Sequence, residues 1–171
     1  MSNETQNETQ YDAPDGQPLI EIVREFDAPR ELVWKAHVDP DLLTQWLGPR
    51  RLTMKVERYD IERGGGYAYT HIDEDGTEYR FWGAVHDARA PELVVQTFGF
   101  EGAGDAASLD RMVLEDLGGG RTRLTITSAF LDVETRDAML RSGMKEGVDQ
   151  GYEQLDELLA AQAAATQGGR P

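Results

Sequence analysis

A change in the spacing of apolar residues constrains the fold of this chain more than any other feature. From residue 51 to residue 130, short runs alternate apolar and polar side chains with a period of two, which is typical of strands with one buried face. From about residue 134 to residue 162, apolar residues recur at every third and fourth position, which is the period of an amphipathic helix. Packing such a helix across an antiparallel sheet buries the apolar faces of both. The pattern therefore predicts an α+β fold in which a curved antiparallel sheet wraps a long C-terminal helix.

One strand and two short helices are expected before the main run of strands. Residues 19–27 alternate apolar and charged side chains, which predicts the first strand. Pro29 and Pro40 each suit the first turn of a short helix, and Asp27 is available to cap the first of them. The Gly-Pro pair at 48–49 cannot continue the second helix, which we therefore expect to end just before it.

Six further strands follow, joined by turns. Residues 51–61 lose their alternation near Tyr59, as a bulged strand would. Asp75-Gly76 and the glycines at 118–120 are typical of hairpin turns. We place the six strands at 51–61, around 67–71, at 79–85, at 92–100, and in the two arms of the last hairpin, RMVLEDL and TRLTITSAF.

Three glycines form a stripe along the C-terminal helix. Gly143, Gly147 and Gly151 are spaced four apart, although each costs about 1 kcal/mol relative to alanine inside a helix. We infer that another part of the chain lies close to the helix backbone there. Since a twisted sheet curls and glycine removes bulk, we expect the space between sheet and helix to remain partly open as a pocket.

The two ends of the chain are expected to be tails around a single domain. Residues 1–17 are polar and end in a Pro-Asp-Gly turn signal, and the last residues read AAATQGGRP. No internal repeat or long linker divides the part between them. We therefore predict a disordered tail at 1–17, one domain at 18–162 and a flexible tail at 163–171.

Composition excludes several kinds of chemistry. The chain has no cysteine, which rules out a disulfide framework, a thiolate zinc site, an iron–sulfur cluster and a cysteine nucleophile. Its formal charge is −15, from 32 acidic and 17 basic residues, and such a surface repels phosphate backbones and anionic lipid. We therefore expect neither nucleic acid nor a membrane as the main partner. The N-terminus is unlike a secretory signal and no apolar run could span a bilayer, so a cytoplasmic location is expected.

The basic residues are mostly arginine, since only Lys35, Lys55 and Lys145 are lysines. An acidic surface poor in lysine favours adaptation to a salt-rich cytosol, where ions screen charges over about 3 Å at molar salt. The alternative is that the acidity only provides solubility.

Five stretches in the expected order resemble one known family. They read FDAPRELVWKAHVDPDLLTQWLGP, ERGGGYAYTHIDEDGTEYRFWGAV, APELVVQTF, LEDLGGGRTRLTIT and DAMLRSGMKEGVDQGYEQLDELL. Over residues 19–160 the chain is similar to the heat-shock protein 90 ATPase activator-like branch of the START-like superfamily, also called SRPBCC or helix-grip. The resemblance implies a helix-grip fold around a hydrophobic cavity. Members of the superfamily bind lipids, hormones or polyketides, or catalyse cyclisation, so the fold alone assigns no reaction.

The resemblance gives little support to a chaperone role. In this branch the co-chaperone activity belongs to larger eukaryotic proteins, in which this domain accompanies a separate chaperone-binding domain. We do not expect a second domain of that kind in a chain of 171 residues.

No catalytic or metal-binding motif accompanies these patterns. His37, His71 and His86 lack histidine partners at the spacing of a metal site, so neither a metal nor another cofactor is expected. There is no GxSxG elbow, and the two GGG runs lack the lysine and the helix start of a phosphate loop. An acidic residue inside the cavity would have a raised pKa, but the pattern assigns none to the inner face.

His71 is the histidine that could act in a site. It lies in phase with Tyr67 and Tyr69 on the expected inner face, where a neutral imidazole could orient a ligand or exchange a proton. The alternative is a histidine held in the core or at its rim by hydrogen bonds.

The candidate ligand-binding residues are the large side chains expected to face the cavity. Aromatic and methionine side chains give an adaptable apolar pocket, with tyrosine hydroxyls and one imidazole as its polar groups, although each taken singly is more typical of simple core. Access to the cavity is expected near Trp46 and near the loop around Gly102. Trp82 is out of phase with these side chains and is expected on the convex face. The candidate residues are Trp46, Tyr67, Tyr69, His71, Phe81, Phe98, Met112, Met144 and Tyr152.

Three functions are compatible with this reading. The first is a cofactor-free module that binds a small hydrophobic or amphipathic molecule between the sheet and the helix. The second, which we favour less, is an enzyme of the cyclase or hydrolase type that uses His71 and a tyrosine as proton carriers. The third is a protein-interaction or co-chaperone-like module that uses the convex face, with a second copy of the chain or another protein as partner.

Overall fold

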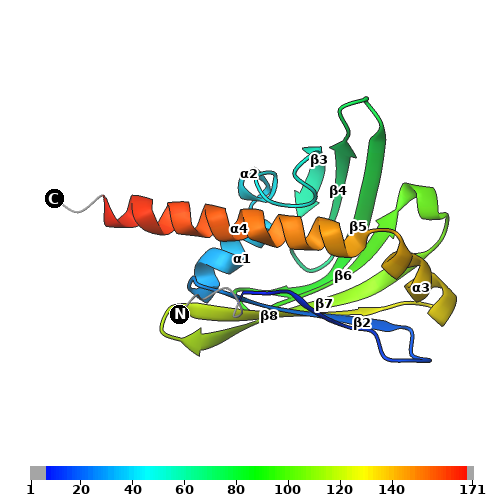
Figure 1. Cartoon of the computed structure of the whole chain (residues 1–171), viewed down its shortest axis with the longest axis horizontal. Coiled ribbons are helices and arrows are strands. Elements are labelled where there is room, and N and C mark those ends of the chain that lie inside the picture. The colour runs from blue at the N-terminus through cyan, green and yellow to red at the C-terminus, as the bar shows by residue number, and fades with distance from the viewer. Residues whose placement is uncertain (1–6, 169–171) are drawn as a thin grey trace.

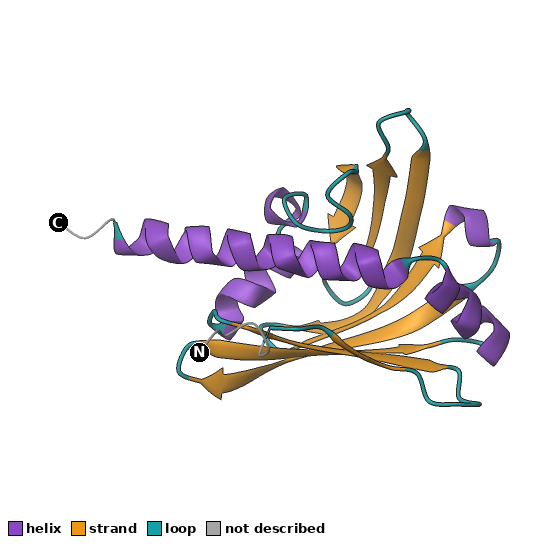
Figure 2. Ribbon diagram, viewed as in Figure 1, coloured by secondary structure: helices purple, strands orange, loops and turns teal. Residues whose placement is uncertain are grey.

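Within residues 7–168, which the computed structural model describes, the chain forms a curved sheet and several helices (Figure 2). The strands are β1 (Gln10–Asp12), β2 (Leu19–Phe26), β3 (Thr53–Asp60), β4 (Gly66–Ile72), β5 (Glu78–Arg89), β6 (Leu93–Phe100), β7 (Ala107–Gly118) and β8 (Arg121–Ala129). The helices are α1 (Arg30–Val38), α2 (Pro40–Leu43), the short 3-10 helix η2 (Glu101–Ala103), α3 (Val133–Arg141) and α4 (Met144–Gln167). None of these helices is long and apolar enough to cross a membrane.

The eight strands form one antiparallel sheet in the order β1-β2-β8-β7-β6-β5-β4-β3. Figure 1 shows that β3, β4 and β5 rise steeply from the plane of β7, β8 and β2, and that α4 runs across the concave side of the bend. The strand predicted at 19–27, the two short helices and the six strands that follow them all occur, as β2, α1, α2 and β3 to β8. The α+β fold with a curved sheet around a C-terminal helix is therefore confirmed.

Two local details of this first half differ from expectation. Asp27 does not cap α1, because Pro29 occupies the N-cap position and makes no side-chain hydrogen bond there. The Asp27 carboxylate instead accepts a hydrogen bond of 2.9 Å from Nε of Arg121. The expected bulge in β3 is present, but its register shift lies between Val56 and Arg58, ahead of Tyr59. The position of an extra residue in the ladder is decided by pairing with β4 and not by the side-chain pattern.

Part of the N-terminal segment is ordered, contrary to the expected disordered tail. β1 adds to the edge of the sheet, with Gln10 opposite Val23 of β2. Nη1 of Arg136, a buried residue of α3, donates hydrogen bonds of 2.8 Å to the backbone oxygens of Pro14 and Gln17. Backbone hydrogen bonds to distant strands and helices hold this segment in place, and its polar composition does not reveal them. Residues 1–6 of that expected tail lie outside the described residues.

The C-terminal helix is interrupted, contrary to the expected single helix from residue 134. Gly143 has φ +83°, in the left-handed region that glycine adopts without strain, and it separates α3 from α4. α4 then continues to Gln167, because the alanines that follow residue 162 are the best helix formers. The flexible tail expected at 163–171 is therefore helical up to Gln167, and residues 169–171 lie outside the described part.

The glycine stripe is explained at one position. A Cβ on Gly151 would lie 3.2 Å from the backbone oxygen of Trp46 and 3.2 Å from the backbone nitrogen of Gly48, so this loop does approach the helix. Gly147 has only ordinary contacts with Pro49, at 3.5 Å, and Gly143 is the break between the helices. The close approach therefore concerns Gly151 alone.

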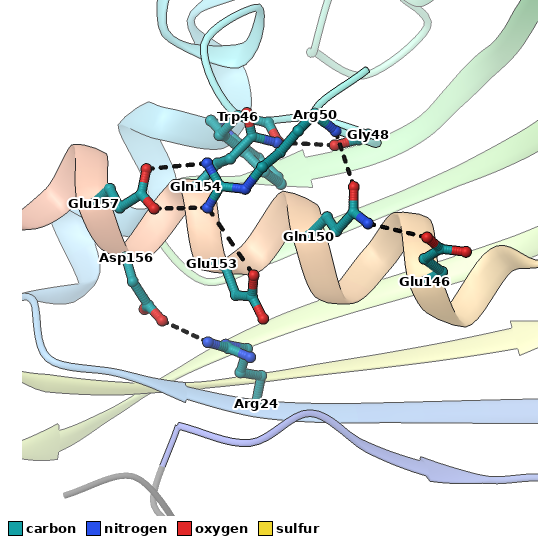
Figure 3. A network of polar contacts seen from close by, with 10 residues as sticks. All are labelled: Arg24, Trp46, Gly48, Arg50, Glu146, Gln150, Glu153, Gln154, Asp156 and Glu157. Atoms are coloured by element: carbon teal, nitrogen blue, oxygen red, sulfur yellow. Dashed lines mark hydrogen bonds and ion pairs between the residues drawn. The ribbon is translucent and has the colours of Figure 1, made fainter. Parts of the chain in front are cut away.

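Polar side chains of α4 fasten the helix to the same loop, as Figure 3 shows. Nε2 of Gln154 donates hydrogen bonds to the backbone oxygens of Trp46, at 3.2 Å, and Gly48, at 2.9 Å. The guanidinium of Arg50 forms an ion pair with Glu157, with 2.6 Å between Nη2 and Oε1. These contacts fix the position of α4 relative to the loop at residues 46–50.

The core fills one half of the interface between sheet and helix. Phe26, Leu124 and Leu155 are fully buried, and they come from β2, β8 and α4. The helices α1 and α2 add the buried Val33 and Leu43 to the same cluster. The other half of the interface, toward α3 and η2, remains hollow.

Candidate functional site

A cavity of about 860 Å³ lies between the concave face of the sheet and the helices α3 and α4. This volume is within the range of about 300 to 1,000 Å³ that is typical of small-molecule sites. All the residues that the sequence proposed for a ligand site line this one space: Trp46, Tyr67, Tyr69, His71, Phe81, Phe98, Met112, Met144 and Tyr152. Their contact with a ligand stays a prediction.

Five neighbouring aromatic rings form one side of the cavity, which we call the aromatic wall: Tyr67, Tyr69, Phe81, Phe98 and Phe100. Tyr69 lies directly opposite Phe81 in the ladder between β4 and β5, and the two ring centroids are 5.3 Å apart. Phe81 in turn stacks on Phe98, with 5.5 Å between centroids. The rings face inward because side chains two residues apart on a strand share one face. The aromatic wall therefore follows from the alternation of side chains along the strands.

The opposite side of the cavity joins the core. Trp46 stacks on Tyr152 of α4 with ring centroids 6.0 Å apart, and its Nε1 donates a hydrogen bond of 2.9 Å to the backbone oxygen of Ala36. Only 3% of Trp46 is exposed, so the Trp46 side chain belongs to the packed side of the cavity, and access near this residue stays a prediction. A large ring with a satisfied N–H is more stable inside the core than at an opening. The loop around Gly102 does border the cavity, through Ala103 and Ala106.

His71 lies at the end of the aromatic wall, on the inner face where the sequence placed it. Its ring makes edge contacts with Tyr69, at 5.3 Å, and Phe81, at 5.6 Å between centroids. Nδ1 is buried and has no hydrogen-bond partner among the described residues. Burial lowers the pKa of His71 to about 4, so the ring is neutral at pH 7. The alternative of a hydrogen-bonded core histidine therefore does not describe this nitrogen.

His37 also lines the cavity, although the sequence did not mark it as a site residue. Its Nδ1 lies 2.7 Å from the backbone oxygen of Val33, and its ring contacts Trp46 at 4.8 Å between centroids. Burial lowers the pKa of His37 to about 4 as well. The sequence did not reveal that His37 lines the cavity, because a single histidine near the end of a short helix can face either the core or the solvent.

The two histidines make the stability of the fold depend on pH. An unperturbed histidine has a pKa of about 6.5, so between about pH 4 and 6.5 the unfolded chain binds more protons than the folded protein. The free energy of unfolding should therefore fall as the pH is lowered through this range, with His71 contributing up to about 1.4 kcal/mol for each pH unit. Urea denaturation at a series of pH values measures this slope.

Single variants separate this effect from the titration of the many carboxylates. His71→Phe keeps a ring in the wall and should flatten the slope, whereas His86→Gln, at an exposed histidine of β5, should leave it unchanged. Equal slopes in the wild type and in His71→Phe would show that burial does not suppress protonation of His71.

One acidic residue lies on the inner face of the sheet, where the sequence analysis had assigned none. Asp110 lines the cavity from β7, beside Gln96, Ser108 and Ser128. Asp110 is two residues before Met112 and therefore shares the face of that residue. The same alternation that located the methionine could have located the carboxylate. Trp82, in contrast, is 58% exposed on the outer face, as its phase predicts.

Together, a curved antiparallel sheet, a long helix across its concave side and an apolar cavity between them define a helix-grip protein of the START-like superfamily. The family described as Activator of Hsp90 ATPase homolog 1-like protein matches residues 27–160, and the chain belongs to this family. No curated protein matches the chain.

Solved structures of bacterial proteins share this fold. A solution structure of a protein from Arthrobacter aurescens is 32% identical, with a TM-score of 0.81, and the match covers 89% of this chain and 91% of that one. A crystal structure of a protein from Rhodobacter sphaeroides is 28% identical, with a TM-score of 0.82 and coverage of 90% and 99%. The AHSA1 protein from Silicibacter pomeroyi is 25% identical, with a TM-score of 0.69 and coverage of 84% and 99%. The chain thus spans nearly the full length of these relatives.

Proposed function

We propose that this protein binds a small hydrophobic or amphipathic molecule in the cavity between the sheet and the helices α3 and α4. The observation that carries the proposal is the cavity itself, a space of about 860 Å³ with the aromatic wall on one side. A space of this size that is lined mainly by apolar side chains favours an apolar ligand, because binding removes both surfaces from water. The expected partner is therefore a small molecule.

The burial of the cavity-lining side chains supports this proposal. Phe81, Phe98 and Met112 are only half-buried, although they face the inside of the fold. In a close-packed core, side chains of this size leave few voids larger than a water molecule. Inward-facing rings that keep exposed surface are typical of a binding site that a ligand completes.

The enzymatic alternative has weaker support. His71 and Tyr69 do lie together, with ring centroids 5.3 Å apart. However, burial lowers the pKa of His71 to about 4 and raises the pKa of the Tyr69 hydroxyl above its usual value. The imidazole is then a weak base and the phenol a weak acid near neutral pH, which is opposite to the pKa values that proton transfer needs.

A protein-interaction role for the convex face also has little support. Trp82 of β5 is 58% exposed, and Leu109 and Leu117 of β7 are 49% and 36% exposed. Single exposed apolar residues are normal on protein surfaces and do not by themselves mark an interface.

Filling the cavity tests the proposal. Met112→Trp adds a large ring to the floor of the cavity, so it should weaken the binding of N-phenyl-1-naphthylamine, a neutral fluorescent apolar probe, by about 10-fold or more. Fluorescence titration gives both dissociation constants. The control is Arg111→Trp, which adds the same ring to the neighbouring exposed position of β7, on the other face of the sheet. If both variants bind the probe as the wild type does, the cavity is not the binding site.

A further inference from the structure

A row of polar side chains crosses the floor of the apolar cavity. Gln96 of β6, Asp110 of β7 and Ser128 of β8 are directly opposite one another in the sheet, and all three line the cavity. Oγ of Ser108 donates a hydrogen bond of 2.8 Å to Oδ1 of Asp110. The carboxylate is therefore held in a fixed place by its own strand and the neighbouring ones.

This carboxylate has no cationic partner in the described part of the chain. The basic residues of the cavity lining are Arg51, His37 and His71. Arg51 pairs with Asp73 instead, and burial keeps the two imidazoles neutral at pH 7. Burial also raises the pKa of Asp110, while hydrogen bonds from the two serines oppose this change. Asp110 is partly buried and has no cation beside it, so a positively charged ligand would stabilise its carboxylate.

The surroundings of Asp110 also suit a cation attached to an apolar body. Phe98 lies directly opposite Ser108 in the ladder between β6 and β7, so the aromatic wall begins beside the carboxylate. The faces of phenylalanine and tyrosine rings attract ammonium groups, and more strongly where water is excluded. An ammonium group bound to Asp110 would therefore lie beside the aromatic wall.

We propose that the ligand of this cavity is a cationic amphiphile, whose amine donates hydrogen bonds to Asp110 and whose flat apolar body lies against the aromatic wall. This inference rests on the proposed function of the cavity and adds the chemical class of its ligand. A carboxylate accepts up to about four hydrogen bonds, so the serine hydroxyls leave acceptor sites for the amine. Ion-paired hydrogen bonds of this kind are about twice as strong as neutral ones.

Three naphthalene compounds that differ in their charge test the inference. They are 1-naphthylmethylamine, 1-naphthalenemethanol and 1-naphthaleneacetate, each used to displace N-phenyl-1-naphthylamine from the wild-type protein. The amine should bind about 10-fold more tightly than the alcohol, and the acetate should bind most weakly. Asp110→Asn should remove the preference for the amine, so that the amine and the alcohol displace the probe about equally.

A matched control separates this site from the overall negative charge of −15, which attracts any cation. Glu115→Gln removes the same charge from an exposed position of β7 and should keep the preference for the amine. Equal displacement by the amine and the alcohol in the wild type overturns the inference, whether or not Asp110→Asn folds. If the fluorescent probe itself does not bind the wild type, the proposed function fails and the inference fails with it.

Discussion

Phe26→Ala should lower the free energy of unfolding by about 3 to 5 kcal/mol, the cost of deleting a fully buried phenylalanine. Phe26 has 0% exposure, contacts the ring of Tyr152 edge-on at 5.5 Å between centroids, and lies under the guanidinium of Arg24 at 5.5 Å. Its removal leaves a void between β2 and α4 that the backbone cannot close, since Gln154 and Gly151 fix the helix against the loop at Trp46. Urea denaturation followed by circular dichroism measures the loss.

Phe98→Ala is the matched comparison, because it deletes the same group from the other half of the interface. Phe98 is half-buried and borders the cavity, so its removal enlarges an existing space instead of creating a new one. The expected cost is about 1 kcal/mol, mainly from the lost stacking on Phe81. Equal costs for the two variants would mean that both halves of the interface are packed in solution, which would contradict an open cavity.

The sequence predicted the two halves of this interface with unequal success. Alternation along β4 identified Tyr67, Tyr69 and His71 as one inward-facing row, because the face of a strand residue depends only on its phase. Trp46 was also placed at the cavity, but its burial was missed. That burial depends on Ala36 and Tyr152, which are close to it in space and distant in sequence.

The errors at the two ends of the fold have the same origin. β1 is held by contacts that its own residues do not reveal, including a hydrogen bond of 2.7 Å from the hydroxyl of Tyr11 to Asp149 of α4. The break at Gly143 was missed because the apolar pattern does not show whether a glycine adopts the helical or the left-handed conformation. Local patterns therefore predicted the elements and their faces, and only the tertiary contacts decided where the elements stop.

The aromatic wall depends on a glycine that the sequence analysis did not single out. Gly83 of β5 lies directly opposite Tyr67 of β4, and the tyrosine ring crosses over it to donate a hydrogen bond of 2.7 Å to the backbone oxygen of Thr97 on β6. A Cβ on Gly83 would lie 2.1 Å from that oxygen and 2.6 Å from the tyrosine hydroxyl. Because the oxygen belongs to the backbone, it cannot move away without disturbing the ladder between β5 and β6.

Gly83→Ala should therefore cost about 3 kcal/mol of stability, at the upper end of what overpacking produces, and it should also displace Tyr67 from the wall. Gly99→Ala on the adjacent strand is the control, because its Cβ would meet Trp82 at an ordinary 3.5 Å and should change stability by less than about 0.5 kcal/mol. Chemical denaturation measures both. Adding Tyr67→Ala should recover part of the loss in Gly83→Ala, because it removes the clash with the ring while the clash with the backbone oxygen of Thr97 remains. A Gly83→Ala protein as stable as Gly99→Ala would show that Tyr67 does not cross β5 at this glycine, and the aromatic wall would need a different explanation.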